Sequence, residues 1–109
     1  YDLIVTGDLG SLGSRLVREL FAREGVQLGT RYDDCGVMIF DAKKQDVHCG
    51  GSGCGCSASV LCGHLLGKLE RGELRRLLFC GTGALLSPLS TQQGESIPAV
   101  CHAVSIERG

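Results

Sequence analysis

The fold class is decided by residues 1–24, whose sequence is YDLIVTGDLGSLGSRLVRELFARE. Asp2–Thr6 is a short apolar, β-prone run that ends at a glycine turn. From Ser11 to Glu24 the apolar residues recur at helical spacing, with a serine in the first turn to cap the helix and Gly25 to end it. A strand that passes through a tight turn into a helix is typical of an α/β fold.

The same alternation continues along the rest of the chain. Apolar runs predict strands at Cys35–Phe40, Leu74–Cys80 and Ala99–Glu107. The segment Ala58–Leu69 is apolar on more than one face, which predicts a largely buried helix. This order indicates an α/β domain with a mixed, mainly parallel sheet packed with helices. Because an irregular loop over residues 81–98 connects the last two strands, we expect those strands to pair antiparallel.

Length, composition and charge argue against several classes of protein. A length of 109 residues fits one domain, and a net charge of −1 lacks the basic face of a nucleic-acid-binding protein. No apolar run approaches the roughly 18 residues of a membrane span, and no signal peptide is visible. Because the chain opens with Tyr1 directly before a predicted strand, we expect it to begin inside a longer protein.

Cysteine and glycine are both abundant. The 7 cysteines are an odd number, so they cannot all pair within the chain. Without a secretory signal, they indicate reduced thiols in a cytosolic compartment. Glycine occurs 17 times, about twice the ordinary usage of roughly 7%.

One glycine motif resembles a dinucleotide site. Thr6–Gly13 has the pattern TGxxGxxG after a strand and before a helix, which suits NAD(P). However, Asp33 and Asp34 fall in a predicted loop rather than at the end of a second strand, and no YxxxK pair follows. A tight strand-to-helix turn explains these glycines without a ligand, and an NAD(P)-dependent oxidoreductase remains an alternative.

Cysteine and histidine side chains cluster in the middle of the chain. The spacing of His48, Cys49, Cys54, Cys56, Cys62 and His64 is unlike that of zinc sites, and we predict no metal. Cys54 or Cys56, near a helix start and His48, is the better candidate for a nucleophile. The two acids before Cys35 are expected to raise its pKa. Since most free cysteines are packing residues, we assign no catalytic residue.

Two glycine-rich loops are the strongest candidate for a binding site. They are residues 50–57 (GGSGCGCS) and 81–88 (GTGALLSP). If their strands are parallel neighbours, both loops lie at the carboxyl ends of the sheet, where open α/β sheets bind ligands. Successive backbone N–H groups there can hold an anion, and hydroxyl groups on both loops can add hydrogen bonds. The alternative is that the glycines only allow close packing of the loops.

Five separated blocks resemble one known family. They are YDLIVTGDLGSLGS (1–14), YDDCGVMIFD (32–41), GGSGCGCSASV (50–60), GTGALLSP (81–88) and QQGESIP (92–98). In this order they resemble the stage V sporulation protein AD family. The resemblance implies a thiolase-like fold of two similar halves, of which residues 1–109 look like the C-terminal half. It also implies a five-stranded type of sheet, with the N-terminal half absent.

The resemblance implies a transport role in spore formation. The family is described as the soluble component that binds dipicolinate (pyridine-2,6-dicarboxylate), with or without calcium, beside membrane subunits. We therefore expect a non-catalytic binding protein, without a cofactor, at the cytoplasmic face of the forespore or inner spore membrane. As expected ligand-binding residues we select those on the two glycine-rich loops: Gly53, Cys54, Ser57, Thr82 and Gly83.

The same resemblance bears on catalysis. Thiolase-like condensing enzymes take two catalytic groups, His or Asn, from the loops that correspond here to Gly7–Asp8 and Gly53–Cys54. Neither loop holds His or Asn, so acyl transfer with a nucleophilic cysteine upstream is the alternative function. Because halves of this fold pack through their central helices, we expect Ala58–Leu69 to expose an apolar patch. The isolated chain is then expected to dimerise or aggregate.

Overall fold

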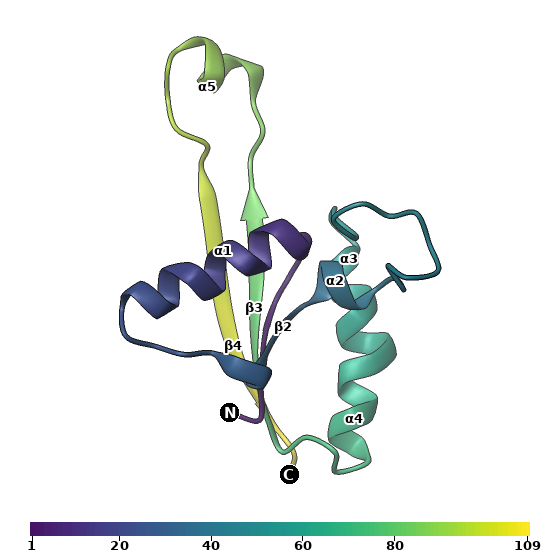
Figure 1. Ribbon diagram of the computed structural model, residues 1–109. Helices are drawn as coiled ribbons and strands as arrows, with labels where there is room; N and C mark the ends of the chain where they lie inside the picture. Colours follow the sequence, from purple (N-terminus) through teal and green to yellow (C-terminus); the bar gives the residue numbers. More distant parts are fainter.

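The computed structural model describes residues 1–109 as a four-stranded sheet with helices against both faces (Figure 1). In chain order the elements are β1 (Leu3–Thr6), α1 (Gly10–Arg23), a 3-10 turn η1 (Gly29–Arg31), β2 (Tyr32–Asp34), α2 (Cys35–Met38), α3 (Cys56–Val60), a π-helical turn η2 (Leu61–Leu65), α4 (Leu66–Glu70), β3 (Arg76–Ala84), α5 (Pro88–Gln92) and β4 (Ala99–Glu107). The strand order is β2-β1-β3-β4, in which β1 runs parallel to β2 and β3 while β4 runs antiparallel to β3. The predicted α/β class, the mainly parallel sheet and the antiparallel last pair are confirmed.

The pleat of the sheet divides the strand residues between two layers. On one face Val5 and Leu77 are fully buried against the helical segment α3–η2–α4, where Leu65 and Leu69 complete the core. The alternate residues of β1 and β3 face α1 instead, because successive side chains of a strand point to opposite faces. On that side an apolar cavity of about 370 Å³ remains between α1 and the sheet.

The strand predicted at Cys35–Phe40 is wrong. The second strand is β2, and the chain turns directly into α2, where Ile39 N–H donates to the Cys35 carbonyl at 3.0 Å. Close backbone contact fixes this turn, since Gly51 N–H donates to the Gly36 carbonyl at 2.7 Å. A β-carbon on Gly36 would lie 2.4 Å from the Gly51 carbonyl oxygen. Apolar composition predicted a strand, whereas this contact makes the segment helical.

The strand count also differs from the expected five, because the sheet has four strands. After α2 the chain passes through an irregular stretch, residues 39–55, directly into α3. A fifth strand at the β2 edge would need residues between α2 and α3, and that stretch forms no strand.

Two further boundaries differ from the prediction. β3 continues through Gly81–Ala84, so the first half of the second glycine-rich loop is strand, paired with the start of β4. The loop predicted over residues 81–98 also contains the short helix α5. Side chains of neighbouring strands, rather than local glycine content, decide where a strand ends.

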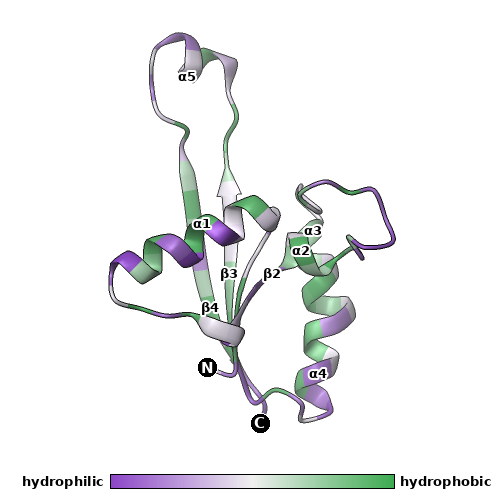
Figure 2. Ribbon diagram, viewed as in Figure 1, coloured by the Kyte–Doolittle hydropathy of each residue, from purple (hydrophilic) through white to green (hydrophobic).

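The helical segment α3–η2–α4 exposes no large apolar side chain, contrary to expectation. Its exposed positions are small or polar, among them Ala58, Ser59, Cys62 and Gly63. Most of the exposed large apolar residues lie instead on α1 and on the β3–β4 hairpin. Figure 2 shows the apolar colouring of both elements, and the hairpin extends beyond the body as an arm with α5 at its tip. No helix in the structure is long and apolar enough to span a membrane.

The buried carboxylate of Asp34 joins three elements. It lies at the end of β2 and accepts hydrogen bonds from the Thr6 hydroxyl of β1, from Leu9 N–H at 3.0 Å and from Gly10 N–H at 2.8 Å. Ser11 N–H donates to the Cys49 carbonyl at 2.7 Å. Neither Ser11 nor Ser14 caps α1 through its side chain, so the predicted serine cap is wrong. The carboxylate from β2 replaces it, at the helix end where a negative charge is most favourable.

Replacement of Asp34 is expected to destabilise the protein strongly. The substitution Asp34→Ala leaves two backbone N–H groups without an acceptor, and the Thr6 hydroxyl keeps only the Tyr32 hydroxyl, at 2.8 Å, as a partner. The expected loss is about 2–4 kcal/mol in the free energy of unfolding, measured by urea denaturation. The matched control Asp46→Asn changes a carboxylate that is 92% exposed and should leave the midpoint unchanged. An equal midpoint for both variants would contradict the role assigned to Asp34.

Candidate functional site

Asp8 connects the two glycine-rich loops. Its Oδ2 atom accepts hydrogen bonds from the Ser52 hydroxyl and from Gly53 N–H, each at 3.1 Å. Its Oδ1 atom accepts one from the Thr82 hydroxyl at 3.0 Å, and Thr82 Oγ1 in turn accepts from Asp8 N–H at 3.1 Å. A single half-buried carboxylate therefore fixes the spacing between the loop before α3 and the end of β3.

The local sequence explains why Asp8 takes this position. Gly7 is buried at the end of β1, and a β-carbon there would lie 2.8 Å from Thr82 Oγ1 and 3.5 Å from Ser57 Cβ. Only glycine lets the β1–α1 turn pass between these two side chains. The next residue then points its carboxylate along the carboxyl edge of the sheet, where open α/β sheets place their ligands.

A groove of about 550 Å³ opens beside this carboxylate. Its lining comes from the β1–α1 turn, the loop before α3 and the base of the hairpin: Asp8, Leu9, Ser52, Thr82, Gly83, Ala84, Leu86, Ala99, Val100 and Cys101. The volume lies within the range of roughly 300–1,000 Å³ that is usual for small-molecule sites. Asp8 is the one charged residue of this lining, and the rest offers hydroxyl groups and small apolar side chains.

The structure brings together only part of the predicted binding set. Thr82 and Gly83 line the groove, and Gly53 N–H is directed to Asp8 at its rim. Ser57 packs beside Gly7 and does not line the groove. Cys54 is exposed and does not belong to the groove lining. The N–H of Gly53 and the hydroxyl of Thr82 are already bonded to Asp8, so a ligand would share these donors with the carboxylate.

Sequence reasoning missed Asp8, and it considered the Ser52 hydroxyl without selecting it for the binding set. Asp8 could have been predicted from its position, because a polar residue just after a predicted parallel strand lies at the ligand-binding edge of the sheet. Ser52 lies within a loop that was singled out, but nothing in its local sequence distinguishes it from Ser57.

The glycine motif of the β1–α1 turn is occupied by protein groups. The N–H groups that a dinucleotide pyrophosphate would need are bonded to the Asp34 carboxylate and to the Cys49 carbonyl. Gly10 has a positive φ of 74°, and a β-carbon there would lie 2.6 Å from the Cys49 carbonyl oxygen. These glycines serve packing at the start of α1, which argues against NAD(P) binding at this turn.

The two buried thiols near the site, Cys35 and Cys56, are not activated nucleophiles. Burial, and after it the Asp34 carboxylate, raises the pKa of Cys35 to about 12. Burial, with Asp8 and Asp34 nearby, also raises the pKa of Cys56. The rise in the pKa of Cys35 that was expected from its acidic neighbours is confirmed in direction. The raised pKa of Cys56 disfavours the thiolate and argues against Cys56 as a nucleophile. The structure places no three His, Cys, Asp or Glu side chains in a group that could hold a metal ion.

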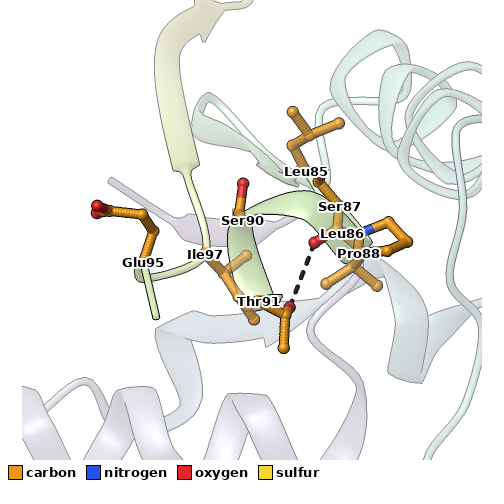
Figure 3. Close-up of a pocket in the computed structure, with 8 residues that line it drawn as sticks. All are labelled: Leu85, Leu86, Ser87, Pro88, Ser90, Thr91, Glu95 and Ile97. Carbon is orange, nitrogen blue, oxygen red and sulfur yellow. Dashed lines mark hydrogen bonds between the residues drawn. The ribbon is translucent and has the colours of Figure 1, made fainter. Parts of the chain in front are cut away.

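A second, smaller groove of about 200 Å³ lies on the arm (Figure 3). It is formed by α5 and the chain on either side of it, and inside it the Thr91 hydroxyl donates to the Ser87 carbonyl at 3.2 Å. Glu95 is its one charged lining residue. No residue of the Asp8 network takes part, and Leu86 is the one residue that lines both grooves.

Comparison with known proteins identifies the family. A family model described as Stage V sporulation protein AD matches residues 1–107. The Stage V sporulation protein AD of Bacillus subtilis (strain 168) is 47% identical over 108 residues, which are 99% of this chain and 32% of that relative. The chain belongs to the stage V sporulation protein AD family. It spans about a third of the length of the curated relative that it matches.

Membership in the stage V sporulation protein AD family confirms the resemblance of the five sequence blocks. In the thiolase-like pattern implied by that resemblance, the loops at Gly7–Asp8 and Gly53–Cys54 supply the catalytic pair of condensing enzymes. The structure brings these loops into contact through the hydrogen bond from Gly53 N–H to Asp8. The Asp8 carboxylate, on the first of these loops, accepts this bond and a second one from the Ser52 hydroxyl.

Thiol accessibility gives a test of the cysteine assignments. At pH 8 the raised pKa keeps Cys35 protonated, since a thiol with a pKa of about 12 forms its thiolate only well above that pH. Brief treatment of the native protein with iodoacetamide is expected to label the exposed Cys49, Cys54, Cys62 and Cys101 and to leave Cys35 and Cys56 unlabelled. Peptide mass spectrometry reads out each site. Rapid labelling of Cys35 in the folded protein would show that this part of the core is assigned incorrectly.

The role of Asp8 in joining the loops can be tested by hydrogen exchange. The substitution Asp8→Ala removes the acceptor for Gly53 N–H and the Thr82 hydroxyl. Faster amide exchange is expected at residues 52–54 and at Thr82, while residues 63–70 keep their protection. The variant Asp41→Ala, in an exposed turn, is the control. Unchanged exchange in both loops would refute the linking role of Asp8.

Proposed function

We propose that this chain forms part of a dipicolinate-binding protein that serves the movement of dipicolinate, with calcium, into the forespore. The observation that carries the proposal is the Asp8 groove, at which both glycine-rich loops meet in a member of the stage V sporulation protein AD family. By the family resemblance, the protein would act at the cytoplasmic face of the forespore membrane beside membrane subunits. The role is binding rather than catalysis.

The groove has the chemistry that a flat aromatic diacid needs. Ala84, Leu86 and Val100 supply apolar contact for a pyridine ring, and Ser52 and Thr82 supply hydroxyl groups for carboxylate oxygens. Such sites combine apolar walls with a few placed polar groups. Gly83 lies exposed on β3, where no side chain hinders the approach of a ligand to the backbone.

Charge sets a condition on this proposal. Dipicolinate has two negative charges, and the groove lining offers Asp8 and no basic residue. The dianion therefore needs a positive partner, which is either a bound calcium ion or side chains from the rest of the longer protein. Calcium prefers carboxylate, hydroxyl and carbonyl oxygens, and Asp8 and Ser52 place such oxygens at one rim of the groove.

Calorimetric titration of dipicolinate into the protein in its full reading frame tests the proposal. Saturable binding is expected, and Thr82→Val should weaken it about tenfold, because the hydroxyl at the groove is lost. Thr91→Val, on the separate arm groove, is the matched control and should bind as the parent protein does. Absence of binding by folded protein would overturn the proposal and turn attention to acyl transfer, tested by acyl-enzyme formation from an acyl-CoA.

Titrations with and without calcium separate the two sources of positive charge. If calcium supplies it, binding requires the ion, and Asp8→Asn lowers the calcium-dependent affinity. If side chains elsewhere supply it, binding is equal in the presence of a chelator, and Asp8→Asn strengthens it by removing a negative charge.

A further inference from the structure

Cys80 and Cys101 lie together on the two strands of the hairpin. In the antiparallel register Cys80 is opposite Ala103, and Cys101 is opposite Thr82. Ala103 and Cys101 are two residues apart on β4, so their side chains share one face of the sheet with Cys80. The two thiols are therefore diagonal neighbours across the strand pair.

The surroundings of this pair suit thiol chemistry. Both cysteines line the apolar cavity of about 370 Å³ between α1 and the sheet. Cys101 is exposed, whereas Cys80 is half-buried. β4 is an edge strand with almost every residue exposed, so it can shift to the backbone spacing that a disulfide requires.

The remaining cysteines differ from this pair. Cys35 and Cys56 are buried in the core on the opposite face of the sheet. The exposed Cys49, Cys54 and Cys62 lie in the loop before α3 and in η2, outside the hairpin. Of the cysteine pairs in the chain, Cys80 and Cys101 combine diagonal positions on adjacent strands, a shared cavity and access for an oxidant.

We propose that Cys80 and Cys101 are a reversible redox pair that forms a disulfide when the protein meets a hydroperoxide. The Cys101 sulfur attacks the peroxide oxygen, the O–O bond breaks, one water leaves, and Cys101 becomes a sulfenic acid. The Cys80 sulfur then attacks the Cys101 sulfur, the S–O bond breaks, and a second water leaves as the S–S bond forms. Two thiols and one hydrogen peroxide thus give one disulfide and two waters, and a thiol reductant reverses the change.

The exposure of the two thiols determines which of them reacts first with the peroxide. Cys101 is the exposed thiol and so meets the oxidant first, while burial, together with the neighbouring Cys101 thiol, raises the pKa of Cys80. The disulfide would close the chain around the arm that contains α5 and fix the strand pair at its base. Because Cys101 is opposite Thr82 and also lines the Asp8 groove, oxidation would restrain one wall of that groove.

The test uses the protein in its full reading frame, treated with hydrogen peroxide, alkylated and digested with trypsin. Both cysteines fall in one tryptic peptide, Leu77–Arg108, because no Lys or Arg lies between Arg76 and Arg108. After peroxide this peptide is expected to take up no alkyl group and to be lighter by two hydrogen atoms. A second cleavage after Glu95 should leave the halves linked until a reductant is added.

Three controls make the result decisive. Cys101→Ser should abolish the linked product, while Cys62→Ser, which removes another exposed thiol, should leave it unchanged. In urea the linked peptide should lose its preference over other pairings. Full alkylation of Leu77–Arg108 after peroxide, over-oxidation of Cys101 without linkage, or equal pairing in urea and in buffer would each overturn the proposal.

Discussion

The carboxylate of Asp34 is the constraint on which the rest of the structure depends. A fully buried negative charge is costly unless hydrogen bonds and favourable dipoles compensate it, and here three donors and the start of α1 do so. These donors belong to β1 and to the β1–α1 turn. The end of β2 therefore holds the first turn of the molecule in one conformation, and the direction of the next carboxylate, Asp8, follows from it.

Asp8 connects the turn that Asp34 holds in place to the candidate site. Its bonds to Ser52, Gly53 and Thr82 join segments that are far apart in sequence, so the groove has one shape before a ligand arrives. Preorganisation lowers the ordering cost of binding. The same carboxylate makes the groove selective by charge, since an anion can enter only with a cation or with positive groups from outside this chain.

Sequence reasoning recovered the parts of the fold that depend on local periodicity. It predicted α1, β1, β4 and the antiparallel last pair, because these follow from spacing and from the absence of a crossover helix. It failed at Cys35–Phe40, where the turn is set by backbone contact between Gly36 and Gly51, which are distant in sequence. It also left Asp33 and Asp34 in a loop, because acidic residues favour strands poorly and nothing local shows that Asp34 is buried. Of the residues selected for the site, Thr82 and Gly83 line the groove and Gly53 donates to Asp8, but the carboxylate that brings the loops together was missed.

The glycine-rich stretch before α3 has two separate tasks, which its sequence alone does not distinguish. At Gly50 a β-carbon would lie 2.2 Å from the Gly36 carbonyl oxygen, and at Gly51 it would lie 2.6 Å from a methyl group of Ile39. These two glycines pack the loop against α2. At Gly53 a β-carbon would meet nothing within 4 Å, yet its φ of 109° is one that other residues rarely adopt, and in this conformation its N–H is directed to Asp8. The first part of the stretch is therefore a packing device, and the part that serves the groove begins at Ser52.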